Sequence, residues 1–259
     1  MPIAAKPSSY TVNTGHTHCP DHLYMMDEGA GPTLTDQGKT GGLNLTITGA
    51  DWSTDGTHGP VLDFVAANTD YAETSSVSGL TGTQTIGVVA YGSAGSATRT
   101  LVSLCNSADF DQYVLMAMLA DENFEVSSRY NNTQQNNNAG IDLPQGVWSF
   151  AAIRFSDSTV DWSLDGTAWD TLAVSHTGLL AAIDRLTIGY RNTTSPGSPY
   201  DDPMCAAMWW KASKSDAEVA SIAADPWQFL DTSIGHPARS RSRGIPGMNT
   251  IASPFGRGW

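Results

Sequence analysis

The chain has 259 residues, enough for one large β-sandwich with extensions or for two small domains, and its eight tryptophans can fill a sizeable core. Its formal net charge of −13 disfavours nucleic acid as a partner, because phosphate contacts need clustered cations. No apolar run reaches the roughly 20 residues that span a bilayer, so no membrane contact is expected either.

The cysteines and the N-terminus indicate the compartment. Cys19, Cys105 and Cys205 are odd in number and far apart, which argues against a disulfide framework and favours free thiols in a reducing cytoplasm. The first residues, MPIAAKPSSYTVNTG, lack the apolar stretch of a signal peptide. We therefore expect a protein that is not exported through a signal peptide.

Short runs of alternating or branched apolar residues predict strands along most of the chain. In chain order these are Leu23–Met26, Leu43–Thr48, Val61–Phe64, Thr85–Tyr91, Thr98–Cys105, Gln112–Leu119, Phe124–Tyr130, Trp148–Phe155, Val160–Leu164, Trp169–Val174, Leu186–Tyr190 and Met204–Lys211. Asp165 and Gly166 are residue types that tolerate a positive φ, which predicts a tight hairpin turn between two of these strands.

Two other segments have distinct patterns. Residues 131–138 (NNTQQNNN) are predicted to be a solvated hairpin loop, with a mobile binding loop as the alternative. Ser215 and Glu218 form a capping box that predicts one helix, with Pro226 ending it and Trp227 turning inward after it.

The ends of the chain differ from its middle. Residues 1–18 are polar and non-periodic and are predicted to be an extended arm, followed by one domain over 19–233. Residues 234–259 are predicted to be a basic extended tail: the last 21 residues contain four arginines and no acid, whereas residues 1–238 carry 26 acids and nine Lys and Arg. These arginines, which could contact another subunit or simply lie in a disordered tail, are Arg239, Arg241, Arg243 and Arg257.

Several segments together resemble a known family. They are HLYMMDEGAGPTLTD, GADWSTDGTHGPVLDF, TQTIGVVAYGSAGSATRTLVSL, GVWSFAAIRFSDSTVDWSLDG, RLTIGY and WWKASKSDAEVASIAADPWQFL. Their order and wording, over roughly residues 20–230, resemble the concanavalin A-like, laminin-G-like jelly roll, in versions found in bacteriophage virion proteins. The resemblance implies an all-β fold: a two-sheet antiparallel jelly-roll sandwich with one short C-terminal helix and extended terminal arms.

The resemblance also implies a calcium site on a rim loop of the sandwich, through carboxylates and carbonyl oxygens. The candidate ligands here are Asp201 and Asp202, and without that ion no cofactor is expected. A second metal candidate is the run of His16, His18, Cys19 and His22, although the sequence offers no second knuckle that would complete a structural site.

No catalytic constellation is visible, so we do not expect an enzyme. The spacing of Asp121, Glu122 and Glu125 does not match the strand motif of jelly-roll glucanases, and the run from Ser163 to Trp169 misses a sialidase-type Asp box by one residue. Glycan binding would use aromatic platforms on exposed loops. The candidates are Trp169, Tyr200, Tyr130 and Tyr71, whereas Trp148, Trp162 and Trp209 are expected in the core.

Two functions fit these patterns. The first is a non-enzymatic phage virion structural protein, a head decoration, collar or fibre component assembled in the host cytoplasm. Its arms would attach it to other virion proteins and to copies of itself. The alternative is an adhesin module that binds host-surface polysaccharide.

Overall fold

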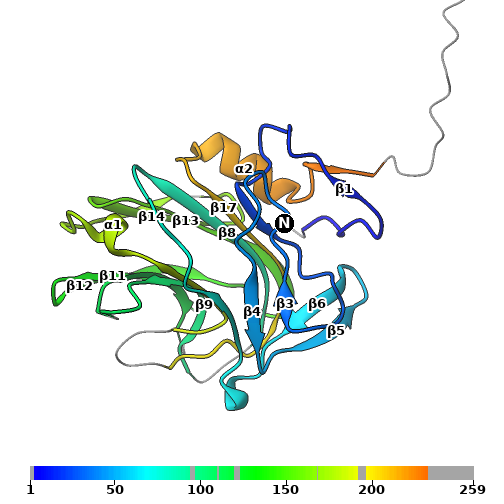
Figure 1. Cartoon of the computed structure of the whole chain (residues 1–259), viewed down its shortest axis with the longest axis horizontal. Coiled ribbons are helices and arrows are strands. Elements are labelled where there is room, and N and C mark those ends of the chain that lie inside the picture. Colours follow the sequence, from blue (N-terminus) through cyan, green and yellow to red (C-terminus); the bar gives the residue numbers. More distant parts are fainter. Residues whose placement is uncertain are drawn as a thin grey trace, which may run out of the picture.

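The computed structural model describes residues 3–93, 97–109, 111–119, 123–167, 169–191 and 197–232. Two antiparallel sheets of eight strands stack face to face, and a two-stranded ribbon lies beside them (Figure 1). Most strands form where branched or aromatic residues recur, because such side chains pack well on a pleated, half-buried surface. The predicted all-β, two-sheet sandwich is confirmed.

The first sheet joins strands that are distant in the chain. Its spatial order is β12 (Thr133–Asp142), β11 (Asn123–Tyr130), β10 (Tyr113–Met118), β9 (Arg99–Cys105), β16 (Arg185–Ile188), β7 (Tyr71–Thr74), β4 (Leu45–Thr48) and β3 (Thr33–Leu34). At its centre, Ser103 of β9 lies opposite Leu115 on one side and Thr187 on the other. Such long-range pairing is typical of jelly rolls.

The second sheet is built around β17. Its order is β15 (Asp170–Ala173), β14 (Thr159–Leu164), β13 (Val147–Phe155), β8 (Gln84–Gly92), β17 (Pro203–Trp210), β6 (Gly59–Asp63) and β5 (Asp51–Asp55), and β2 (His22–Tyr24) also pairs with β17. One edge of β17 pairs with β8. Along the other edge, β6 pairs with the first residues of β17 and β2 pairs with Ala207–Trp209.

The main core lies between the two sheets. Trp162 and Trp209 are buried in it, as predicted, whereas Trp148 is half-buried against the opposite side of the second sheet. A bulge in β17 after Met204 interrupts the alternation, so Cys205 faces the outer side of the sheet. All three cysteines are free, as predicted, and all three are buried.

A second apolar layer covers the outer face of the second sheet. Met208 and Trp210 of β17 and Phe150 of β13 pack there under α2 (Asp216–Ala224) and the N-terminal segment. Figure 1 shows both elements lying over the β8 and β17 side of the sandwich. Trp227 and Phe229 follow α2 into this layer and are buried, which confirms the prediction that the chain turns inward after the helix.

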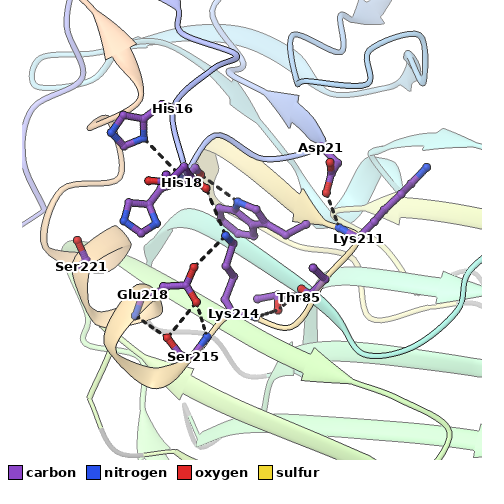
Figure 2. A network of polar contacts seen from close by, with 12 residues as sticks. His16, His18, Asp21, Thr85, Lys211, Lys214, Ser215, Glu218 and Ser221 are labelled. Carbon is purple, nitrogen blue, oxygen red and sulfur yellow. Dashed lines mark hydrogen bonds and ion pairs between the residues drawn. The ribbon is translucent and has the colours of Figure 1, made fainter.

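The predicted capping box fixes the start of α2. The Ser215 hydroxyl accepts the Glu218 amide proton, and the Glu218 carboxylate accepts the Ser215 amide proton at 2.9 Å. Figure 2 shows Lys214 beside this turn, where its ammonium group donates to Glu218 at 3.1 Å and to the Thr17 carbonyl oxygen at 3.4 Å. The helix and the N-terminal segment are therefore joined by one polar network.

The N-terminal segment differs from the prediction of an arm that reaches neighbouring subunits. Residues 3–18 have little regular structure beyond β1 (Thr11–Val12), which pairs with β18 (Leu230–Asp231), and they lie on their own domain. The Trp227 indole donates to the Ala4 carbonyl oxygen at 2.7 Å, and the Trp210 indole donates to the His18 carbonyl oxygen at 3.0 Å. The expected boundary between an arm and a domain thus falls inside a packed region.

The Asn- and Gln-rich segment also differs from its prediction. Residues 131–138 were expected to form a loop, but β12 begins at Thr133 and pairs with β11 along its length. Only Asn131 and Asn132 form the turn, both with positive φ. Backbone pairing at a sheet edge needs no apolar alternation, so the sequence pattern did not reveal this strand.

The helices are few and short. α1 (Leu179–Ala182) is a single turn between β15 and β16, and η1 (Ala66–Asn68) is a single 3₁₀ turn between β6 and β7. In the part of the chain that the structure describes, no helix has the length and apolar character needed to span a bilayer.

Candidate functional site

A hollow of about 450 Å³ opens at the end of the sandwich where β6, β8 and β16 finish and β7, β9 and β17 begin. It is lined by Ala66, residues 97–99, Ser198, Pro199 and Asp201. We call it the rim hollow. Its lining comes from three loops that are distant in sequence, as expected for a site presented by a rigid sandwich.

Asp201 holds the loop after β6 against the loop before β17, and Asp70 fixes the first of these loops internally. The Asp201 carboxylate accepts the Ala66 amide proton at 2.9 Å, across 135 residues of sequence. The buried Asp70 carboxylate accepts the Val65 amide proton at 2.8 Å from within the same loop. The wall of the rim hollow is therefore fixed by charge-assisted hydrogen bonds.

Arg99 forms the floor of the rim hollow. Its guanidinium donates to Asp202 at 2.8 Å and to the Ser93 carbonyl oxygen at 2.6 Å, and the Asp202 carboxylate also accepts the Ser93 amide proton at 3.2 Å. Burial raises the pKa of Asp202, against the opposing effect of Ser93 and Arg99. The third guanidinium nitrogen, Nε, is buried and has no partner among the residues that the structure describes.

Tyr200 was predicted to be a glycan platform, and this prediction is wrong. Its side chain is 0% exposed, because its ring packs edge-on against Phe64 with centroids 6.2 Å apart. Its hydroxyl donates to the Tyr91 carbonyl oxygen, and burial raises its pKa well above the usual value. Tyr200 positions the loop that carries Ser198 and Asp201 but does not contact solvent.

The surroundings of the rim hollow are acidic. Burial raises the pKa of Asp63, and the charges of Asp201, Asp51 and Asp70 raise it further. Asp51 and Asp63 face each other across β5 and β6. An anionic ligand would meet like charge here.

The predicted calcium ligands do not fit that ion well. Asp201 is exposed, but Asp202 is buried and paired with the guanidinium of Arg99. Calcium takes six to eight oxygen ligands, and a fixed cation beside one carboxylate opposes it. Across residues that the structure describes, no three His, Cys, Asp or Glu side chains are placed to hold a metal ion.

A stacked tyrosine pair lies at the same end of the sandwich. The rings of Tyr71 and Tyr190 are 5.7 Å apart at 25°, and both are half-buried. Tyr71 follows Asp70, and Tyr190 follows Gly189, whose carbonyl oxygen accepts the Tyr200 amide proton at 2.7 Å. Tyr71 was predicted as a platform residue, whereas Tyr190 was expected only to end a strand.

The remaining aromatic candidates lie elsewhere. Trp169 packs on the outer face of the second sheet, where the Arg154 guanidinium covers its ring at 3.9 Å. Tyr130 ends β11 at the opposite end of the first sheet, beside His176. The four predicted platform residues therefore do not form one site.

The histidine-rich run does not converge on a metal site. The His22 ring bonds to Asp36 at 2.7 Å, and Cys19 is buried with its thiol 3.6 Å from the Pro20 carbonyl oxygen. His18 lies beside Lys214, where burial lowers its pKa and the charge of Lys214 lowers it further (Figure 2). The run thus helps to fasten the N-terminal segment.

Other predicted features have mixed outcomes. Asp165 and Gly166 form the predicted turn with positive φ values of 51° and 67°. Asp121 and Glu122 lie outside the described residues, as do the four tail residues Arg239, Arg241, Arg243 and Arg257.

Sequence reasoning missed Arg99, Thr98 and Tyr190. Thr98 and Arg99 occupy the start of a predicted strand, where a polar residue needs no further explanation. The role of Arg99 becomes visible only in the structure, where it contacts Asp202, a residue 103 positions further along the chain. An isolated Arg inside a strand pattern was the one available signal, since a buried Arg needs a charged partner.

Comparisons with known proteins support the fold. No protein-family model matches the sequence, and a comparison with curated proteins gives no match. The binding domain of botulinum neurotoxin DC, solved with rat synaptotagmin II, superposes with a TM-score of 0.58 at 9% identity, over 79% of this chain and 51% of that one. NanB with Optactamide gives a TM-score of 0.50 at 17% identity, over 62% of this chain and 27% of that one.

A third comparison is weaker. The Ruminococcus gnavus IT-sialidase CBM40 bound to α2,3-sialyllactose gives a TM-score of 0.46 at 13% identity, over 57% of this chain and 84% of that one. At these identities the likenesses concern the fold alone. The chain is an all-β jelly-roll sandwich, and any activity must be argued from its own surface.

Proposed function

We propose that this protein is a non-catalytic carbohydrate-binding module that takes a neutral saccharide at the rim hollow. The proposal is carried by one observation: a hollow of about 450 Å³ in which Thr98, Ser198 and Asp201 meet from two different loops. Hydroxyl and carboxylate groups can both exchange hydrogen bonds with sugar hydroxyls. The volume falls within the range of small-molecule sites.

The tyrosine pair would supply the apolar part of the contact. Sugar rings present apolar faces that pack on aromatic side chains, and Tyr71 and Tyr190 are half-buried at the same end of the sandwich. Because the two rings already stack on each other, only their outer faces and edges are free for a ligand.

Charge narrows the class of saccharide. Asp201 lines the hollow, and its charge and that of Asp51 both act on Asp63. The nearby guanidinium of Arg99 is already paired with Asp202. A sialylated ligand would therefore be repelled at the rim hollow. We do not expect this chain to bind the sialyllactose that the Ruminococcus gnavus module binds.

The test is binding of neutral and sialylated oligosaccharides to the full chain by calorimetry. Asp201→Asn keeps an oxygen for the Ala66 amide while removing charge, and Tyr190→Ala removes half of the aromatic pair. Both should weaken binding of a neutral oligosaccharide by about fivefold or more, since each lost contact is worth about 1 kcal/mol. Asp170→Asn, an exposed residue of β15, is the matched control and should change nothing.

Absence of binding for every neutral saccharide would overturn the proposal. Binding that survives both rim substitutions would place the site elsewhere. The particle-component function and virion localisation stay predictions, since their main argument, the basic tail, lies outside the described residues.

A further inference from the structure

A second pocket of about 310 Å³ lies at the other end of β6 from the rim hollow. The N-terminal segment contributes Lys6, Ser8 and Tyr10 to it, and the turn between β5 and β6 contributes Asp55 and His58. Asp27, Thr57 and Pro60 are also part of the lining. We call it the arm pocket.

Its strongest donors are already used. The buried Lys6 ammonium donates to the Met25 carbonyl oxygen at 3.1 Å and to the Pro60 carbonyl oxygen at 2.8 Å. The Tyr10 hydroxyl donates to the Asp27 carboxylate. Lys6 and Tyr10 therefore hold the N-terminal segment in place and have little left to offer a ligand.

Its acceptors are in surplus. One oxygen of Asp55 takes the amide protons of Thr57 at 2.8 Å and His58 at 2.7 Å, which leaves much of the second oxygen's capacity free. His58 is 1% exposed, and its Nδ1 is buried without a partner within the described part of the chain. Burial lowers the pKa of His58, so the ring is uncharged at neutral pH, and in the tautomer protonated on Nε2 its Nδ1 accepts a hydrogen bond.

The charge balance favours a cation. Two carboxylates, Asp27 and Asp55, line the pocket against one ammonium group. Partial burial acts to raise the pKa of Asp55, but hydrogen bonds from His58, Thr57 and Trp148 outweigh it and lower that pKa, so the carboxyl stays ionised at neutral pH. Within the described residues, no metal-binding group of three suitable side chains exists, so an organic cation fits better than a metal ion.

A guanidinium group matches these demands. It carries five N–H donors and no acceptor, and its flat face stacks on aromatic rings. The chain already binds one in this way: Arg154 lies 3.9 Å from the Trp169 ring centre and pairs with Asp161 at 3.2 Å and Asp216 at 2.7 Å. The arm pocket offers the same two elements: an aromatic ring in Tyr10, whose hydroxyl is bonded to Asp27, and two carboxylates in Asp27 and Asp55.

The C-terminal end of the described residues lies next to this pocket. Asp231 of β18 pairs with Thr11, the residue after Tyr10, and the described residues end at Thr232. Arg239 is seven residues further on, which an extended chain can span as about 23 Å. The last 21 residues carry four arginines and no acid, whereas the rest of the chain has a strong excess of acids.

We propose that the arm pocket binds a guanidinium group, and that its occupant is an arginine from the 239–243 segment of the same chain. The tail then acts as a clasp over the N-terminal segment. This inference does not depend on the saccharide proposal, because the two pockets lie at opposite ends of β6.

The first test removes the occupant and supplies it again. In the full chain, Arg239→Ala, Arg241→Ala and Arg243→Ala together leave the pocket vacant, and calorimetry follows the binding of a synthetic peptide of residues 236–246. We expect saturable binding that falls about tenfold with Asp55→Asn and weakens when lysine replaces arginine in the peptide. Asp170→Asn is the control and should not alter the affinity. Absence of peptide binding, or equal binding of the lysine peptide, would overturn the proposal.

The second test asks whether the contact is intramolecular. Trypsin cleavage of the unsubstituted protein after Arg239, Arg241 and Arg243 is followed by mass spectrometry at low and high protein concentration. The clasp predicts slow cleavage that is independent of concentration and is accelerated about fivefold by Asp55→Asn. Protection that appears only at high protein concentration would mean that the arginines bind the arm pocket of a second copy of the chain. Cleavage unaffected by Asp55→Asn would remove the tail as the occupant.

Discussion

The guanidinium of Arg99 and the carboxylate of Asp202 form a 2.8 Å ion pair in which the two side chains are only 4% and 7% exposed. The pair joins β9 to the start of β17 and supports the floor of the rim hollow. Removing one partner from such a pair leaves a buried charge uncompensated, and this is more harmful than never having had the pair.

Asp202→Ala should therefore lower the free energy of unfolding by about 3 kcal/mol or more. Urea denaturation at neutral pH measures the change. The matched control is Asp201→Ala, which removes the adjacent, exposed carboxylate and one hydrogen bond to Ala66, and should cost about 1 kcal/mol. Equal effects of the two substitutions would mean that Arg99 finds water or another partner when Asp202 is absent.

Gly189 allows the chain to turn beside the core at the same rim. Its φ is +83°, and a Cβ there would lie 2.4 Å from the ring of Phe64. Gly189→Ala should destabilise the protein by about 3 kcal/mol, from a backbone cost of about 1–2 kcal/mol and the displacement of the ring. Gly146→Ala is the control: its φ is +71°, but a Cβ would meet nothing closer than 3.8 Å, so only the backbone cost applies. Similar losses in thermal unfolding experiments would show that Phe64 moves aside freely.

The N-terminal segment should be needed for folding, although it has little regular structure. Removing residues 1–13 deletes the β1–β18 pairing, the two hydrogen bonds of Lys6 and the buried side chain of Ile3. It also uncovers part of the apolar outer layer of the second sheet. We expect a loss of stability of about 3 kcal/mol or more, together with aggregation.

Removal of residues 233–259 is the comparison for this truncation. The β1–β18 pairing, the Lys6 hydrogen bonds and the burial of Ile3 all lie within residues 3–232, so unfolding should remain cooperative. The loss of stability should be smaller than for the N-terminal truncation and limited to what the proposed tail arginine contributes in the arm pocket. Light scattering and chemical denaturation of the two truncated proteins separate these expectations. A stable, monomeric protein without residues 1–13 would contradict the role assigned to the segment.

How far the sequence predicts this molecule depends on the range of the interactions. Alternation along Val160–Leu164 and the capping box at Ser215 are local patterns, and both give the observed elements. β12 was missed because its polar residues pair through the backbone alone. The prediction of a sandwich rests on local patterns such as the alternation along Val160–Leu164.

The sites depend on long-range contacts. Tyr200 is as plausible on a rim as in a core until Phe64 and Tyr91 are found around it. Arg99 and Asp202 are 103 residues apart, and the arm pocket joins Tyr10 to Asp55. A single sequence contains these residues but does not show which of them meet, so the aromatic candidates were assigned without their neighbours.

The capping box of α2 should make part of the stability depend on pH. The Ser215 amide and, more weakly, Lys214 lower the pKa of Glu218 from 4.5 to about 2. A carboxyl whose pKa is depressed in the folded state contributes stability that is complete above the unfolded pKa and is lost as pH falls through the folded one. The stability difference between the unsubstituted protein and Glu218→Gln should thus be constant above about pH 5 and shrink between pH 4.5 and pH 2.

Lys214→Met should narrow this pH window by raising the pKa of Glu218, and salt should weaken the effect because the Glu218 side chain is 36% exposed. Denaturant unfolding of the three proteins across this pH range measures the effect, and a difference that persists unchanged at the acid end would show that Glu218 acts through packing and not through its charge.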